Sequence, residues 1–137
     1  MLLFICLSVV FISQAQNVSG TTVLKSTSSH VDTDTITNTT EKTQFGNVGF
    51  NKNVVSVQST ITKLSGTLGG VMRLEGSLDG TNYQRINTTD SLVLANVTTQ
   101  TKIFTISPNL WKYIRVKVTP VGTQSSKMNS IALWRRE

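Results

Sequence analysis

The chain has 137 residues, with 13 Lys or Arg against 7 Asp or Glu and a formal net charge of +6. This length is enough for one domain with its own core and too short for two. The basic residues are spread along the chain, whereas nucleic-acid binding requires a basic face with stacking aromatic side chains, so nucleic acid is not an expected partner. A weak attraction to acidic glycans or anionic cell surfaces needs less structure and fits the charge.

Residues 1–15 are predicted to be a secretory signal peptide. An apolar run from Leu2 to Ile12 precedes Ser13-Gln14-Ala15, which places small residues at the positions that a signal peptidase requires. The run is too short to cross a bilayer as a helix, so we expect no membrane span in the mature chain. Signal peptides usually carry Lys or Arg before the apolar run, and this sequence has none there. The alternative interpretation of residues 1–15 is a buried N-terminal strand or an assembly contact. The only cysteine, Cys6, lies in this leader, which excludes a disulfide in the mature protein.

Residues 16–43 are predicted to be a polar N-terminal arm, because Ser, Thr and Asn dominate and little can be buried. Within it, Thr21–Lys25 has the composition of a short edge strand. The segment that ends at Thr37 is either a second edge strand or an extended arm along a neighbouring subunit. Apolar residues become denser from Phe45 onward, so the compact domain is predicted to span residues 44–137.

A β-hairpin is predicted over residues 71–85, reversing at Asp79-Gly80, a pair that readily adopts the angles of a tight turn. Met72, Leu74 and Leu78 fall on one face of the first arm, which predicts a buried side for it.

The rest of the compact region alternates between apolar and polar residues at the period of β-strands, and it contains no convincing helix. Further strands are predicted at residues 54–64, 92–94, 102–106, 111–119 and 130–134. Short strands joined by Gly, Pro, Asn and Ser turns predict an all-β fold. We expect an antiparallel β-sandwich or jelly roll of seven or eight strands, with a small barrel as the alternative.

No catalytic constellation is present, and the protein is not expected to be an enzyme. The only histidine, His30, lies in the polar arm, where rigid positioning is not expected. Glu75 and Asp79 are the only acids close together in the predicted core region, and they are better explained as an ion-pair partner and a turn residue. Asp32 and Asp34 alone are too few for a calcium site, so neither a metal nor a cofactor is expected.

Aromatic side chains are the better candidates for binding, because a flat ring can stack on a sugar or fill a pocket of a partner. Tyr83 and Trp111 are predicted to lie at strand ends beside loops, with Asn82 and Arg85 supplying polar contacts to a ligand. The alternative is a packing role between the sheets for three aromatic residues, Trp111, Tyr113 and Trp134.

Two resemblances support a contact function. The stretch Glu75–Tyr83, followed by Tyr113-Ile114-Arg115-Val116, resembles discoidin or galactose-binding-like domains. Those domains are jelly rolls that mostly bind glycans or other surfaces. A longer resemblance covers most of residues 54–137 and is to small β-rich structural proteins of tailed bacteriophages. It rests on Val55–Gln58, Thr62–Thr67, Leu74–Tyr83, Leu94–Lys102 and Tyr113–Val116.

The phage resemblance implies a non-enzymatic structural or decoration protein of the virion. Its partners would be other virion subunits or further copies of itself, with a possible contact to a host-cell glycan. The apparent signal peptide departs from the usual phage pattern, so a secreted carbohydrate-binding module is the alternative. The expected location is therefore the virion or the extracellular space.

Overall fold

The computed structural model describes residues 19–26, 33–50 and 52–135, which form ten strands and no helix. The strands are β1 (Ser19–Ser26), β2 (Thr33–Thr37), β3 (Lys42–Asn47), β4 (Val54–Gly66), β5 (Gly70–Ser77), β6 (Gln84–Arg85), β7 (Ser91–Leu94), β8 (Thr99–Ile106), β9 (Tyr113–Pro120) and β10 (Gln124–Arg135). In this part of the chain no helix is long and apolar enough to cross a membrane. The predicted leader, His30 and Asp32 lie outside the described residues.

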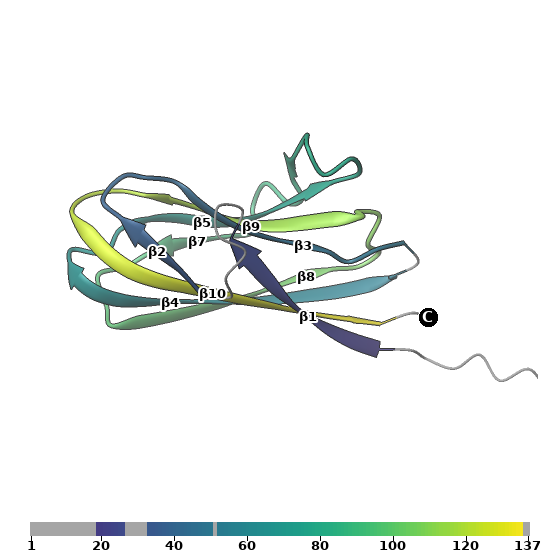
Figure 1. The fold of residues 1–137 in the computed structure, drawn as a ribbon, viewed down its shortest axis with the longest axis horizontal. Helices are drawn as coiled ribbons and strands as arrows, with labels where there is room; N and C mark the ends of the chain where they lie inside the picture. The colour runs from purple at the N-terminus through teal and green to yellow at the C-terminus, as the bar shows by residue number, and fades with distance from the viewer. Residues whose placement is uncertain (1–18, 27–32, 51, 136–137) are drawn as a thin grey trace, which may run out of the picture.

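The strands form two antiparallel layers (Figure 1). In sheet A, β1 and β2 pair along one side of β10, which pairs on its other side with β4, and β4 pairs with β8. In sheet B, β3 pairs with β9 and β9 with β5, while β6 and β7 pair with the far side of β5. The C-terminal end of β1 pairs with β3, so this strand joins the two sheets. The predicted all-β class and antiparallel sandwich are confirmed.

The core lies between the two layers and is built from alternating positions of the central strands. Val55, Val57 and Ile61 of β4, predicted to share a face, are all fully buried. From sheet B, β9 contributes every second residue to the same core, namely Ile114, Val116 and Val118. Burying such side chains contributes about 1.5–3 kcal/mol each, so packing between the sheets holds the layers together.

The division of the chain differs from the prediction of a polar arm at residues 16–43. β1 and β2 complete sheet A by pairing with β10, and their side chains Leu24 and Ile36 are fully buried. Pairing with β10 gives hydrogen-bond partners to backbone groups of both strands, so they need few apolar residues to belong to the fold. The sandwich therefore begins at β1 and not near residue 44.

β3 was not predicted, because its inward positions are not typically apolar. Gln44 and Gly46 face the core where Val or Ile would show the alternation. The Gln44 side chain is accommodated by a hydrogen bond from its Nε2 to the carbonyl oxygen of Met128, at 3.1 Å.

The predicted hairpin is present but is wider than a two-residue turn. Glu75 of β5 lies opposite Arg85 of β6, and residues 78–83 form the loop between them. Asp79 organises this loop: its Oδ1 accepts hydrogen bonds from the Ser77 hydroxyl and from two backbone N–H groups, all at 2.8 Å. The two backbone hydrogen bonds contribute most to lowering the pKa of the Asp79 carboxyl below its usual value.

Leu78 was predicted to lie on the buried face of the hairpin, and this is wrong. The alternation holds for Met72 and Leu74, which are buried, but β5 ends at Ser77 and the Leu78 side chain is 64% exposed in the loop. Once the chain leaves the ladder, the strand period no longer decides which side a residue faces.

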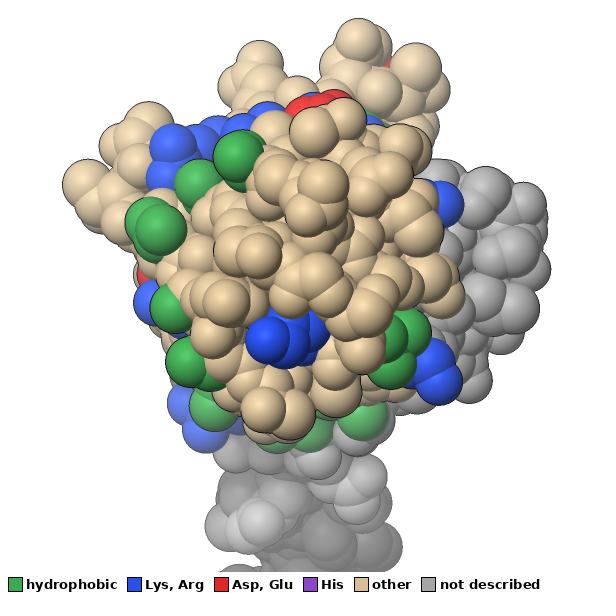
Figure 2. Space-filling model, turned by 90° about the vertical axis from the view of Figure 1, so that its left-hand side faces the viewer, with side chains coloured by type: hydrophobic (Ala, Val, Ile, Leu, Met, Phe, Trp, Pro, Cys, Tyr) green, Lys and Arg blue, Asp and Glu red, His purple; other side chains and the backbone are tan. Residues whose placement is uncertain are grey.

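Figure 2 shows the end of the sandwich that lies at the left of Figure 1. The turns that follow β2, β4 and β9 meet at this end. Most of its surface consists of uncharged polar side chains and backbone (Figure 2). A group of Lys or Arg side chains and a patch of Asp or Glu lie along the top, on the side of sheet B, and further Lys or Arg side chains are scattered over the rest of this end.

Candidate binding site

The outward face of sheet B carries a row of side chains contributed by four strands. Phe45 of β3 lies opposite Arg115 of β9, Arg115 lies opposite Glu75 of β5, and Glu75 lies opposite Arg85 of β6. Directly opposed residues of antiparallel strands project from the same side of a sheet. Residues from three separate parts of the sequence are thereby aligned across the sheet.

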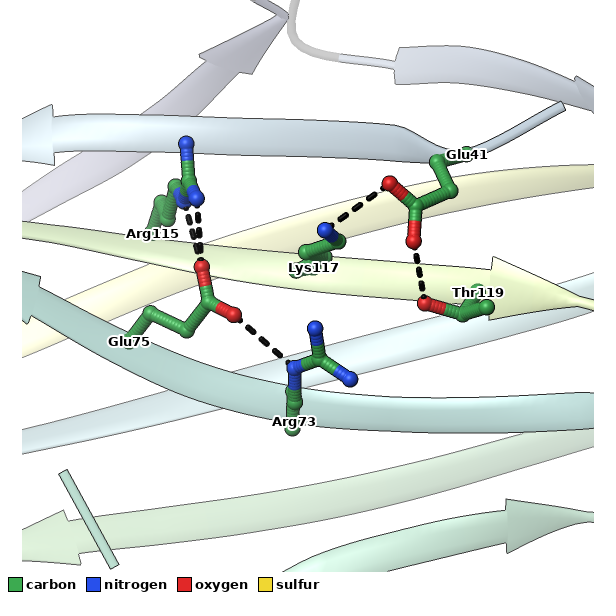
Figure 3. A network of polar contacts seen from close by, with 6 residues as sticks. All are labelled: Glu41, Arg73, Glu75, Arg115, Lys117 and Thr119. Carbon is green, nitrogen blue, oxygen red and sulfur yellow. Dashed lines mark hydrogen bonds and ion pairs between the residues drawn. The ribbon is translucent and has the colours of Figure 1, made fainter. Parts of the chain in front are cut away.

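Glu75 holds two arginines in place (Figure 3). Its Oε1 accepts a hydrogen bond from Nε of Arg73 at 2.8 Å, and its Oε2 accepts one from Nε of Arg115 at 2.7 Å. The Glu75 side chain is only 7% exposed. Burial by itself would raise the pKa of Glu75, but the hydrogen bonds and positive charges of the two guanidinium groups outweigh it and lower the pKa. Glu75 is therefore a charged anchor.

A second cluster lies beside the first on the same face (Figure 3). Lys117, opposite Arg73, forms an ion pair with Glu41 at 2.8 Å, and the Thr119 hydroxyl donates a hydrogen bond to Glu41 at 2.8 Å. These two hydrogen bonds lower the pKa of the Glu41 carboxyl. Because Glu41 is about half exposed, the pair is screened by water and contributes little stability.

A hollow of about 370 Å³, here named the Tyr83 pocket, opens between this face and the hairpin loop. Phe45, Gly80, Thr81, Tyr83 and Arg115 line it. The guanidinium carbon of Arg115 lies 4.0 Å from the centroid of the Tyr83 ring, a cation–π contact. Burial raises the pKa of the Tyr83 phenol, and the Arg115 charge counteracts part of that rise. The pocket thus presents two aromatic side chains and a positioned guanidinium.

The structure brings some of the predicted binding residues together. Tyr83 lines the pocket. Arg85, two residues after Tyr83, lies opposite Glu75 at the end of the row of side chains on sheet B. Asn82 is used within the loop, because its Nδ2 donates to Oδ2 of Asp79 at 2.7 Å. Phe45 was not predicted, because the inward positions Gln44 and Gly46 hide the alternation of β3 and no local signal marks this strand.

Trp111 does not join Tyr83, since its ring lies on the core side of sheet B. A Cβ on Gly76 would lie 2.4 Å from Cδ2 of the Trp111 ring, and Gly76 is an inward position opposite Ile114. Trp111 is partly buried and packs against the hydrophobic core, which agrees with the alternative of a packing role. The strand begins only at Tyr113, so the predicted alternation does not extend back to Trp111.

The other two aromatic residues differ in role. Trp134 packs against the core with Lys52 Nζ 3.2 Å from its ring centroid. Tyr113 occupies an outward position of sheet B, opposite Ser77, and its ring lies 3.3 Å from the place of a Cβ on Gly80. Tyr113 therefore supports the hairpin loop and does not pack between the sheets.

Glu75 and Asp79 have the roles that the sequence indicated, an ion-pair partner and a turn residue. The oxygens of Glu75 are bound to Arg73 and Arg115, and those of Asp79 accept hydrogen bonds within its own loop. Within the described ranges, no group of three or more His, Cys, Asp or Glu side chains could hold a metal ion.

No protein-family model matches the chain, and no curated protein sequence matches it. Among solved structures it is similar to a CBM4 carbohydrate-binding module, with 8% sequence identity and a TM-score of 0.51. The match covers 86% of this chain and 79% of that one. At this identity the likeness shows the fold alone, in agreement with a jelly-roll sandwich.

Other similar structures are mostly carbohydrate-binding modules, together with a pilus and a tailspike. The Bacillus endospore appendage subunit, from disulfide-linked pili, is 11% identical at a TM-score of 0.48, with 97% of this chain and 100% of that chain covered. The bacteriophage CBA120 tailspike protein 4 domain is 10% identical at a TM-score of 0.48, with 86% and 19% covered. Scores this low establish no shared function, and membership among phage structural proteins stays a prediction.

Proposed function

We propose that the protein is a non-enzymatic carbohydrate-binding module whose ligand occupies the Tyr83 pocket. The observation that carries this proposal is an open hollow lined by Phe45 and Tyr83 and by Arg115, whose guanidinium Glu75 fixes. A pyranose ring has an apolar C–H face that packs on aromatic rings and hydroxyl groups that accept hydrogen bonds from a guanidinium.

Preorganisation strengthens the proposal. Glu75 and the Tyr83 ring restrain Arg115 before any ligand arrives, so little side-chain freedom is lost on binding. The hairpin loop that forms one wall is held by the hydrogen bonds of Asp79. The similarity to the CBM4 fold supports the same reading, because that fold is used by a carbohydrate-binding protein.

The test is isothermal titration calorimetry with soluble xylan, mannan and polygalacturonate. We expect binding to at least one of them, and Phe45→Ala and Tyr83→Ala should each weaken it about tenfold or more, the effect of removing a central aromatic contact. Phe50→Ala is the matched control, because Phe50 is 67% exposed and lies outside the pocket. Absence of binding to all three polymers, or an equal loss in the Phe50 variant, would refute the proposed site.

A second candidate function is assembly, in a virion or a homo-oligomer, through the outward face of sheet A. Three apolar side chains are exposed there: Ile103 (58%), Ile131 (37%) and Leu133 (56%). Ile131 and Ile103 flank Gln58 across three neighbouring strands, and a hollow of about 340 Å³ lies among them. Grouped apolar side chains on an exposed sheet are typical of a protein–protein contact.

Light scattering over a range of concentrations tests the assembly candidate. A second copy docked on this face should give a mass above that of the monomer, and Ile103→Lys should return it to the monomer because a buried charge disrupts an apolar contact. Val93→Lys is the control, since Val93 is 72% exposed and belongs to sheet B. A monomer at all concentrations, absent from purified phage particles, would exclude this candidate.

A further inference from the structure

The face around the Tyr83 pocket carries more positive than negative side chains. Two adjacent rows of the ladder contain Arg115 and Arg85 in the first and Lys117 and Arg73 in the second. Against these four cations, the rows and their margin hold the carboxylates of Glu75 and Glu41. Arg73 and Arg115 enclose Glu75, so the guanidinium groups are more exposed than the carboxylate.

Donor groups remain for a ligand after the internal bonds are made. Arg73 uses only its Nε to bind Glu75, and its two terminal nitrogens have no hydrogen bond to any other residue drawn in Figure 3. Arg85, opposite Glu75 at the edge of the row, is exposed, and its side chain forms no ion pair within the described residues. A guanidinium presents a planar fork of donors that matches a carboxylate.

The negative charge of the hairpin loop beside the pocket does not oppose an anion strongly. Asp79 lies in the hairpin loop, and both of its oxygens accept hydrogen bonds from Ser77, Thr81 or Asn82. Several donors converge on that carboxylate and spread its charge, whereas the terminal nitrogens of Arg73 form no hydrogen bond to the other residues drawn in Figure 3. The net field at the mouth of the pocket therefore favours a negative ligand.

We infer that the Tyr83 pocket takes an acidic polysaccharide, with a sugar ring against Phe45 and Tyr83 and its carboxylate on the neighbouring arginines. This inference rests on the proposed carbohydrate-binding function and names its ligand class. A neutral polymer would fill the aromatic part of the pocket and leave the cations of the two rows without a ligand group.

The test compares polygalacturonate with its fully methyl-esterified form, which keeps the sugar ring and lacks the charge. By titration at low salt, the acidic polymer should bind at least tenfold more tightly than the ester, and its affinity should fall as sodium chloride is raised from 50 to 500 mM because salt screens the attraction. Arg85→Gln should weaken binding of the acidic polymer about fivefold and binding of the ester by less, because the ester has no negative charge for Arg85 to pair with. Lys127→Gln, which removes one charge from exposed sheet A, is the matched control.

The outcomes separate this inference from the proposed function. Equal affinity for the acid and its ester, or tighter binding of xylan or mannan with no salt dependence, overturns the acidic ligand and leaves the carbohydrate-binding function standing. Absence of binding to every polymer overturns both. An equal loss of affinity in Arg85→Gln and Lys127→Gln would show a general charge effect and refute the role of the row. The thermal midpoint of each variant verifies that it is folded.

Discussion

Gly70→Ala is expected to destabilise the protein by about 3 kcal/mol or more, through backbone strain and steric overlap together. Gly70 opens β5 with φ of +124°, a conformation that residues with a side chain rarely adopt. A Cβ there would lie 2.3 Å from the carbonyl oxygen of Thr119 and 2.7 Å from Cα of Pro120. Both atoms belong to the backbone of β9, which cannot turn aside as a side chain can. Urea denaturation measures the loss.

Gly49→Ala is the matched control for this substitution. Gly49 also has a positive φ, +73°, but a Cβ there would have no atom within 4 Å. Gly49→Ala should therefore lower the free energy of unfolding only by the cost of placing a side chain on a residue with positive φ, about 1 kcal/mol. Equal destabilisation by the two substitutions would mean that the close approach of β5 to β9 at Gly70 does not exist.

The second large effect is expected at Glu75, where Glu75→Gln should cost about 2 kcal/mol at pH 7. The substitution keeps an oxygen acceptor but removes the charge that Arg73 and Arg115 share. The substitution should also change how the stability depends on pH. The folded pKa of Glu75 lies below its ordinary value of 4.5, so the unfolded state binds more protons as the pH falls. The stabilisation that the Glu75 carboxylate provides is complete above pH 4.5 and is lost as the pH falls through the folded pKa of Glu75.

Thermal unfolding between pH 7 and pH 3 tests this dependence. The wild-type midpoint should fall steeply below about pH 4.5, and the Glu75→Gln midpoint should fall less, since the titrating group is gone. Glu41→Gln serves as the comparison, because its pair with Lys117 is exposed and should contribute no more than about 0.5 kcal/mol. Parallel pH profiles for wild type and Glu75→Gln would show that Glu75 does not anchor the two arginines.

The strands that the sequence predicts well are those with β-branched residues in strict alternation. Val55, Val57 and Ile61 of β4 and the apolar positions of β9 identify their strands and their buried faces without any tertiary information. β2 and β3 behave differently, because they obtain their stability from backbone pairing with β10 and β9. Local composition cannot show a partner that is supplied by a distant part of the chain.

The candidate site likewise contains residues that local sequence predicts and residues that depend on distant strands. Tyr83 could be predicted because a turn and a strand end are local features. The approach of Phe45 to Arg115, and of Arg115 to Glu75, depends on the register between strands far apart in sequence. The placement of Trp111 on the core side depends on the space beside Gly76, which only the packed structure reveals. Nonlocal register therefore decides which residues form the pocket.

The position of β10 has a consequence for synthesis of the protein. β1, β2 and β4 all precede β10 in the chain, and all three pair with it. While the ribosome is still translating the region before β10, these strands have no central partner, and their exposed edges are open to chaperones and to aggregation. Sheet A can close only after residues 124–135 have left the exit tunnel, so β1, β2 and β4 wait for this strand before their layer is complete.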